Sequence, residues 1–378
     1  MATTEKKFSI IKKILFVFIF LLLLATVAEL LAARYYYRLY GKRKLALREA
    51  WMHAKESWEQ NIATQKKRRA NYANQQRARP DSSRAWNQRV YDEMLEANHF
   101  VYDPWVGFRH NDFAGTILNV KKYERRTVPV ITGHTSNDTI TIWLLGGSTT
   151  FGFNVADFET LPSYLAQLLA ADSTLTTAIR VRNFGIPYFY SYQEYQLFCQ
   201  LLEQEPTPQW VVFMDGLNDL NYTQTAPQRT HFFYHRLAHF MDPSHPEWEP
   251  ALPPQLAADS MLKTYRHTQQ LIQKQANAYN IQCLFIIQPV PFYNYPNQKN
   301  DAACSQQDLP AFRYAYPRLE QMSNQRPNML YWGNLLQQAP VVPFIDATHY
   351  TPAFNRYLAQ LLFQWLRPRI KTATSHAS

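Results

Sequence analysis

The feature that most constrains the fold of this chain is an alternation of short apolar runs with longer amphipathic segments from residue 139 onwards. Runs rich in β-branched and aromatic residues predict strands, and they lie at residues 139–145, 179–184, 209–214, 281–287 and, more briefly, 341–345. Parallel strands need crossover connections, so strands that alternate with helices predict a mostly parallel sheet covered on both faces. We therefore expect an α/β fold, a three-layer α/β/α sandwich with a five-stranded, mostly parallel sheet.

The segments between these runs carry helical patterns. Helices are expected at residues 163–170, 193–204 and 258–279. The last helix is the best defined, because Thr351 suits its cap, Pro352 suits its first turn, and apolar residues then recur at intervals of three and four as far as Leu366. We expect residues 371–378 to form a disordered tail.

Near the N-terminus the chain carries a second strong signal, an apolar segment from residue 14 to residue 33. As a helix its 20 residues would be about 30 Å long, which matches the hydrocarbon core of a bilayer. Four lysines precede it within residues 1–13. We therefore expect a cytoplasmic tail, a single transmembrane helix, and a remainder on the extracytoplasmic side, the periplasmic side of a bacterial inner membrane.

Two observations leave alternatives open for this segment. Basic residues also follow it closely, so the charge bias does not favour this orientation, although long domains translocate largely regardless of charge; these residues are Arg34, Arg38, Lys42, Arg43 and Lys44. The small residues at the end of the segment also suit the cleavage site of a signal peptide, which would be removed from the mature protein.

The net charge of +10 is concentrated in one part of the chain. Residues 42–89 contain 13 Lys and Arg against four Asp and Glu, so the remainder is close to neutral. A basic face for nucleic acid is therefore not expected. Residues 34–97, with almost no Gly or Pro, predict a basic juxtamembrane helical stalk that is broken near residues 78–83. Its charge either binds anionic lipid or another envelope polyanion, or is simply solvated.

Residues that suit acyl transfer follow four of the five predicted strands. Ligands in open α/β sheets bind beyond the carboxyl ends of the strands, so these residues are expected at one edge. They are Gly147 and Ser148 after the first strand, Gly185 after the second, Gly216, Asn218 and Asp219 after the third, and Asp346 and His349 after the fifth.

The types of these residues fit one chemistry. A serine hydroxyl is a weak nucleophile that needs a neighbouring base. His349 can accept the proton of Ser148 if Asp346, three residues upstream, holds the other ring nitrogen. The tetrahedral intermediate then needs hydrogen-bond donors for its oxyanion, and the backbone N–H groups of Ser148 and Gly185 and the side-chain amide of Asn218 are the candidates.

With these residues the chain resembles the SGNH (GDSL-like) hydrolase superfamily, whose four motif blocks appear as GGSTTFG, NFG, GLND and DATH within residues 143–349. The resemblance implies the flavodoxin-like form of the sandwich. It also implies that Ser148 is the nucleophile, that Asp346 and His349 complete a triad, and that Gly185 and Asn218 help to build the oxyanion hole. Residues 1 to about 100 lie outside the resemblance.

Three further residues are expected to support this site. Gly147 stands where the best-known form of the family has Asp, a departure that leaves the nucleophile in place but argues against a simple soluble lipase. Gly216 belongs to the GLND block, and Asp219 is expected to order the loop of Asn218. Asp215 is interpreted as a structural residue.

Neighbouring site classes fit less well. GGSTTFG lacks the Lys of a phosphate-binding Walker loop, and it is G-x-S-x-T rather than the G-x-S-x-G elbow of α/β-hydrolases. Cys199, Cys283 and Cys304 lack the paired spacing of a zinc or redox site. We expect neither a metal nor an organic cofactor.

These observations give a domain map and a function. A catalytic domain is expected at residues 98–370, with an aromatic-rich insertion at 222–258 that either covers the site as a lid or covers the core. The expected function is that of a membrane-anchored serine esterase that removes acyl groups from an envelope carbohydrate or lipid. An O-acyltransferase would use the same residues, since access to the site decides the acceptor. A third hypothesis is a catalytically silent envelope scaffold, and the sequence does not indicate an oligomeric state.

Overall fold

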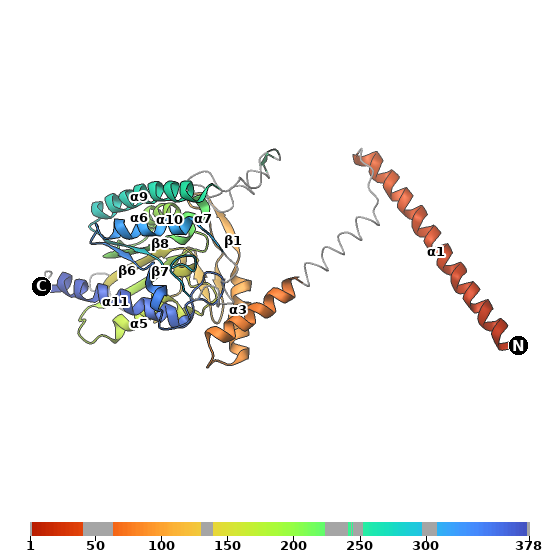
Figure 1. Cartoon of the computed structure of the whole chain (residues 1–378), viewed down its shortest axis with the longest axis horizontal. Helices are drawn as coiled ribbons and strands as arrows, with labels where there is room; N and C mark the ends of the chain where they lie inside the picture. Colours follow the sequence, from red (N-terminus) through yellow and green to blue (C-terminus); the bar gives the residue numbers. More distant parts are fainter. Residues whose placement is uncertain are drawn as a thin grey trace. The chain divides into compact units, whose positions relative to one another are not determined.

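The computed structural model describes residues 2–40, 63–129, 139–223, 252–296 and 308–375, together with residues 241, 242 and 244. The chain divides into two compact units, Met1–Ala70 and Asn71–Ser378 (Figure 1). Most of the predicted insertion at 222–258 lies outside the described residues.

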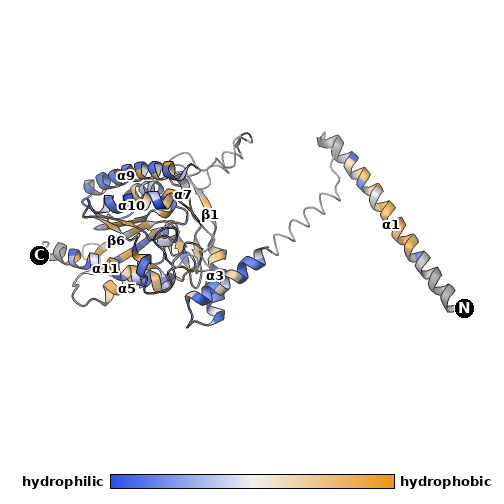
Figure 2. Ribbon diagram, viewed as in Figure 1, coloured by the Kyte–Doolittle hydropathy of each residue, from blue (hydrophilic) through white to orange (hydrophobic). Residues whose placement is uncertain are grey.

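Among its described residues, the first unit contains the long helix α1 (Ala2–Tyr40) and part of the helix that ends at residue 78. Within α1 the stretch Leu15–Tyr35 has a mean hydropathy of 2.7 and none of it is buried, and it stands out as an apolar run in Figure 2. Its 21 residues suffice to cross a bilayer, and within the described parts of the chain no other helix meets that condition. The apolar helix predicted at residues 14–33 is thus confirmed as a candidate membrane span or signal anchor.

The second unit is built around a sheet in which five neighbouring strands are parallel. Their spatial order is β7-β6-β8-β9-β10, which is the 2-1-3-4-5 order of flavodoxin-like folds. The predicted fold class is therefore confirmed. The strands are β6 (Thr139–Gly146), β7 (Ala178–Gly185), β8 (Trp210–Asp215), β9 (Gln282–Ile287) and β10 (Met329–Tyr331).

Three short antiparallel strands extend this sheet beyond β7, so it has eight strands within the described residues where the sequence predicted five. They are β5 (Glu124–Arg125), β4 (Asn119–Lys121) and β3 (Phe113–Ala114). Strands of two or three residues are too short to show an alternating pattern, which explains why they were missed. A separate hairpin is formed by β1 (Phe100–Asp103) and β2 (Gly107–His110).

The fifth parallel strand is not the one that the sequence predicted. Residues 341–345 form no strand, and Phe344 makes only a single bridge with Tyr350. Pro343 lies within this run and has no N–H to donate to a ladder, so the run does not extend a sheet. The edge position belongs to β10, which pairs with β9. The DATH block therefore lies in a loop rather than at a strand end.

Helices cover both faces of the sheet (Figure 1). One face packs through Trp143, Phe213 and their apolar neighbours, and the other through Ile142 and Val212. Because successive side chains of a strand point to opposite faces, this alternation buries the sheet on both sides. The first face carries α6 (Ser191–Gln204), α9 (Pro254–Ala278) and α10 (Ala311–Ser323), and the second carries α5 (Leu161–Ala171) and α11 (Pro352–Ser375).

The last helix begins where it was predicted and ends later. Thr351 Oγ1 accepts the N–H of Phe354 at 3.1 Å, which is the expected cap. The helix then continues to Ser375, so residues 371–375 are helical instead of disordered. Neither Gly nor Pro occurs in those five residues to end the helix.

The last part of the predicted stalk belongs to the second unit, which begins at Asn71 rather than at residue 98. The helix α3 (Arg84–Ala97) buries Val90 and Met94. The carboxylate of its Glu93 accepts the N–H groups of Ile117 and Leu118 at 2.6 and 2.7 Å. A helix whose polar sequence suggests full exposure to solvent thus packs on the domain and binds its backbone N–H groups at residues 117 and 118. The expected break is present, since one helix ends at residue 78 and α3 begins at Arg84.

Candidate active site

β6 ends at Gly146, and Ser148 is the first residue of the short helix α4 (Ser148–Phe151). Gly147 forms the turn between strand and helix. A side chain at this position would displace its neighbours, because its Cβ would lie 2.6 Å from Asn218 Nδ2 and 3.0 Å from the carbonyl oxygen of Phe189. The tight turn places Ser148 at the carboxyl edge of the parallel strands, where doubly wound sheets bind ligands.

The structure brings Ser148, His349 and Asp346 together. His349 Nε2 lies 2.9 Å from Ser148 Oγ, although 201 positions separate the two residues in the sequence. On the other side of the ring, Nδ1 lies 2.8 and 2.9 Å from the two carboxylate oxygens of Asp346. A hydroxyl, an imidazole and a carboxylate thus form a continuous hydrogen-bonded chain.

Asp346 is held as an anion by its surroundings. Its Oδ1 accepts the backbone N–H groups of Thr348 and His349 at 3.0 and 2.9 Å. Burial raises the pKa of this carboxyl, but His349 and the N–H donors outweigh it and lower the pKa to about 2. The carboxylate is therefore ionised at neutral pH and can orient the Nδ1–H of His349.

Asn154 is a member of the site that sequence reasoning missed. Its Nδ2 donates to Asp346 Oδ2 at 2.6 Å, and its backbone carbonyl oxygen accepts a hydrogen bond from Nε2 of Gln75 at 3.1 Å. Asn154 has φ of 65°, in the left-handed region that Asn adopts more readily than most residues. An Asn that follows a GGSTTFG block within a turn is the signal that would have pointed to it.

The segment between α4 and Asn154 is held by a fully buried arginine. Arg125 donates to the carbonyl oxygens of Phe151, Gly152 and Val155 at 2.8, 2.6 and 2.7 Å. Its Nε lies 3.0 Å from Asp157 Oδ1, and both side chains are buried. The same segment carries Phe153, whose ring packs on that of His349 with centroids 4.8 Å apart. Arg125 thus fixes the support of the imidazole, and neither it nor Phe153 was predicted.

The role expected for Gly185 needs correction. Its N–H donates to Asn183 Oδ1 at 3.0 Å, so this donor is already used within its own strand. A Cβ at position 185 would lie 2.3 Å from the backbone nitrogen of Phe151. Gly185 therefore allows α4 to approach β7, and this close approach explains the glycine without an oxyanion.

Asn218 lies beside the serine turn, near the start of α7 (Leu217–Thr223). Its Nδ2 donates to the carbonyl oxygen of Phe189 at 2.6 Å, and the same nitrogen limits the space at Gly147. Tyr188, which precedes Phe189, has φ of 70°, a conformation that favours glycine. The amide of Asn218 and the loop that carries Phe189 thus form one wall beside Ser148.

The two remaining predicted residues, Gly216 and Asp219, flank Asn218 in the sequence at the start of α7. Gly216 has φ of 121°, which only glycine adopts easily. The carboxylate of Asp219 accepts the N–H of Gly216 at 3.4 Å and both the N–H and the hydroxyl of Ser191. These contacts join the start of α7 to the start of α6.

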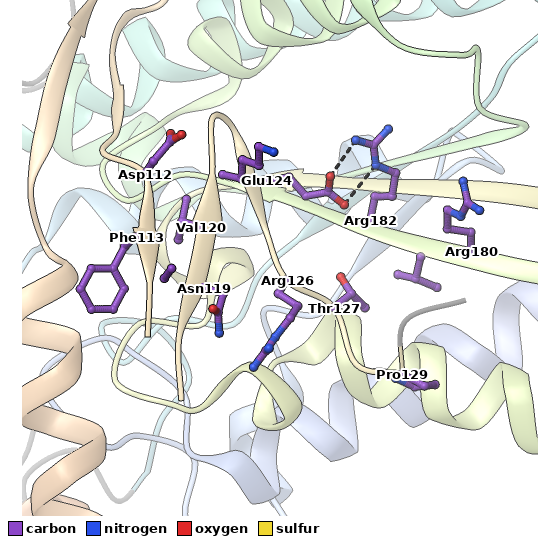
Figure 3. Close-up of a pocket in the computed structure, with 13 residues that line it drawn as sticks. Asp112, Phe113, Asn119, Val120, Glu124, Arg126, Thr127, Pro129, Arg180 and Arg182 are labelled. Atoms are coloured by element: carbon purple, nitrogen blue, oxygen red, sulfur yellow. Dashed lines mark hydrogen bonds and ion pairs between the residues drawn. The ribbon is translucent and has the colours of Figure 1, made fainter. Parts of the chain in front are cut away.

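Two cavities differ in their relation to Ser148. A cavity of about 10 Å³ is lined by Gly147, Ser148 and Asn218 together with buried acidic residues. A cavity of about 580 Å³ is lined instead by residues of β3, β4, β5 and β7 (Figure 3). There Arg182 pairs with Glu124 at 2.7 Å, and no triad residue lines it. The larger cavity is therefore separate from the candidate site.

Comparisons with known proteins find likeness at the level of structure only, since no family model and no curated protein matches the chain. An esterase EstA from Pseudoalteromonas sp. is 15% identical, with 61% of this chain and 98% of that chain covered and a TM-score of 0.38. Est24, a carbohydrate acetylesterase from Sinorhizobium meliloti, is 12% identical over 61% and 99%, with a TM-score of 0.38. The aryl esterase of M. smegmatis is 16% identical over 61% and 99%, with a TM-score of 0.37.

At these levels of identity and TM-score the likeness does not assign an activity. The arrangement of the motif residues in this chain is more specific than that overall likeness. Four motif blocks lie around one sheet edge, and the parallel strands follow the flavodoxin-like order. The resemblance to the SGNH (GDSL-like) hydrolases implied this α/β fold. It also implied that the GGSTTFG, NFG, GLND and DATH blocks lie near one another.

Proposed function

We propose that this chain is an SGNH-type serine esterase that removes acyl groups from a carbohydrate or lipid ester. The proposal rests on the 2.9 Å contact between Ser148 Oγ and His349 Nε2, with Nδ1 of the same ring on Asp346. Each of the four sequence motifs is weak evidence alone. This contact, by contrast, joins residues that are far apart in the sequence into the nucleophile–base–carboxylate chain that nucleophilic catalysis requires.

In the proposed reaction Ser148 Oγ attacks the ester carbonyl while His349 accepts its proton. The ionised Asp346 holds the imidazole in the correct tautomer and stabilises the imidazolium. The oxyanion is stabilised by the N–H of Ser148 and the Nδ2 of Asn218. His349 then gives its proton to the leaving alcohol, and water repeats the cycle on the acyl-enzyme.

Labelling with a fluorophosphonate probe tests this proposal directly. The wild-type chain is expected to label and to hydrolyse an activated acetyl ester, whereas Ser148→Ala is expected to do neither. Thr149→Ala is a matched control, since it removes a neighbouring hydroxyl that bonds Gln288 at 2.9 Å instead of the imidazole. Labelling that persists in Ser148→Ala would show that the nucleophile lies elsewhere. Repeating the ester assay with added oligosaccharide distinguishes hydrolysis from acyl transfer.

We further propose that α1 anchors the enzyme in a membrane with the second unit on the extracytoplasmic side. The support is the apolar stretch Leu15–Tyr35 and the lysines that precede it. A reporter active only in the periplasm, fused after Ser378, is expected to be active. A silent reporter, with a cytoplasmic reporter active at the same position, would reverse the orientation.

A further inference from the structure

Three buried acidic side chains lie beside the serine turn and have no role in the reaction proposed above. Glu194 is in the first turn of α6, Asp215 ends β8, and Asp219 is in α7; their exposed fractions are 1%, 3% and 3%. Together with Ser148 and Asn218 they line the cavity of about 10 Å³. That volume holds about one water molecule, so a substrate does not reach them.

The three carboxyl groups are not equally supported. Asp219 accepts hydrogen bonds from Gly216 and Ser191. By contrast, the Glu194 and Asp215 carboxyls meet no backbone N–H and no cation among the described residues, and the groups that interact with them are each other, Asp219 and the hydroxyl of Tyr265. A carboxylate buried without donors or a cation is strongly disfavoured relative to its protonated form.

Among the described residues, no cation acts on the carboxyl groups of the cluster. The groups that act on Glu194 and Asp215 are one another, Asp219 and the hydroxyl of Tyr265 from α9. Tyr316 from α10 and Cys283 from β9 also face this region and are neutral.

Burial and mutual repulsion set the order in which the cluster ionises. Burial raises the pKa of Asp219 to about 6 despite its donors. Burial, and then the neighbouring negative charges, raise the pKa of Asp215 and Glu194 well above their ordinary values. Asp219 therefore carries the first negative charge of the cluster.

We propose that Glu194 and Asp215 are positioning residues that act in their protonated form, keeping the cavity behind Asn218 and Ser148 free of any charge beyond that of Asp219. This inference rests on the proposed function. An oxyanion that develops beside Asn218 is repelled by each further negative charge in the same cavity. Ionisation of the pair therefore weakens transition-state stabilisation without blocking substrate binding.

The first experiment measures the protonation of the pair independently of any reaction. An acid whose pKa is raised on folding stabilises the fold below its unfolded pKa, and that stability is lost as the pH rises through the folded pKa. The melting temperature of the full chain in detergent is expected to fall between pH 6 and pH 10. Glu194→Gln and Asp215→Asn are each expected to reduce this fall. Glu203→Gln, an exposed residue of the same helix, is expected to reproduce the wild-type curve.

The second experiment connects the pair to catalysis. The kcat of ester hydrolysis by the wild type is expected to fall about tenfold at alkaline pH, the size expected for one added charge at short range in a protein, with KM little changed. The fall should be absent from Glu194→Gln or Asp215→Asn and present in Glu203→Gln. An alkaline fall that is identical in all four proteins would overturn the proposal, as would identical melting curves.

These two measurements also separate this inference from the proposed function. If the melting curves differ as expected but Ser148 neither labels nor supports hydrolysis, the esterase assignment fails and the protonated pair stands. If Ser148 labels and the melting curves coincide, the esterase assignment stands and the protonated pair fails.

Discussion

Two buried charged regions lie near the serine turn, and they differ in whether each charged group is paired with an opposite charge. Beyond the turn, Arg125 donates to three carbonyl oxygens and pairs with Asp157. On the side of the small cavity, Glu194 and Asp215 share that cavity with Ser148, and no cation is among the described residues that act on them. Both regions are as buried as the apolar core, so burial alone does not distinguish them.

The difference teaches what each region contributes. A buried charge is tolerated where donors and acceptors surround it, and removing one partner then leaves the other uncompensated. Where a buried carboxyl group has neither a cation nor a backbone N–H donor, it stays protonated instead, and its effect on stability depends on pH. The Arg125 region is thus a fixed clamp on the segment that supports His349, whereas the acidic region responds to protons.

The largest expected effect comes from breaking the Arg125 region. Arg125→Met is expected to lower the free energy of unfolding by about 3–5 kcal/mol, because it removes the fully buried cation paired with Asp157 and leaves that carboxylate only the exposed Arg126. Denaturant titration of purified protein measures the loss. Arg180→Met is the control, since Arg180 on β7 is half-buried and forms no ion pair within the described residues. A loss below 1 kcal/mol for Arg125→Met would show that the clamp is not needed for stability.

Replacing an Asp by Asn is expected to change the free energy of unfolding in opposite directions in the two regions. At pH 8 Asp157→Asn is expected to destabilise the fold by about 2–3 kcal/mol, because it removes the counter-charge of Arg125. Asp215→Asn is expected to stabilise it by about 1 kcal/mol, because an amide cannot acquire the charge that burial opposes. Unfolding free energies of both variants at pH 5 and pH 8 measure the contrast. Two losses of similar size at both pH values would contradict the distinction between the regions.

Some features of the fold and of the candidate site are predictable from the sequence, and others are not. The strands β6 to β9 were found because each is a run of six to eight mostly buried residues, long enough for composition to indicate a strand. Ser148, Asn218, Asp346 and His349 were expected to lie close together because the carboxyl ends of parallel strands converge. The structure places them at that edge, even though the last two lie in a loop.

Other parts depend on contacts that one sequence does not reveal. Arg125 lies in a strand of two residues and meets carbonyl oxygens, which every residue possesses, so no side-chain pattern identifies it. Gly185 was assigned to the oxyanion hole because a glycine suggests close approach, whereas the group that approaches is the backbone of α4. Residues 341–345 have strand composition, but Pro343 prevents pairing and β10 takes the edge.

The last expected effect is on catalysis and concerns Asn154, which connects the segment held by Arg125 to Asp346 of the triad. Asn154→Gly removes the amide that donates to Asp346 at 2.6 Å while it tolerates the φ of 65°. The expected result is a fall in kcat of about tenfold, the loss of one hydrogen bond to a charged group, with KM little changed. His349 and two backbone N–H groups still hold the carboxylate, which limits the effect.

Asn154→Asp sharpens the test, because it keeps the size of the side chain and the tolerated φ but places a second carboxylate against Asp346. Like charges at this distance raise the pKa of the pair, so the fall in kcat is expected to exceed that of Asn154→Gly at pH 8 and to shrink as the pH is lowered towards 5. Steady-state kinetics across this range measure both. Equal kcat values for the Gly and Asp variants at every pH would mean that Asn154 supports only the turn, and that the clamp by Arg125 reaches His349 through Phe153 alone.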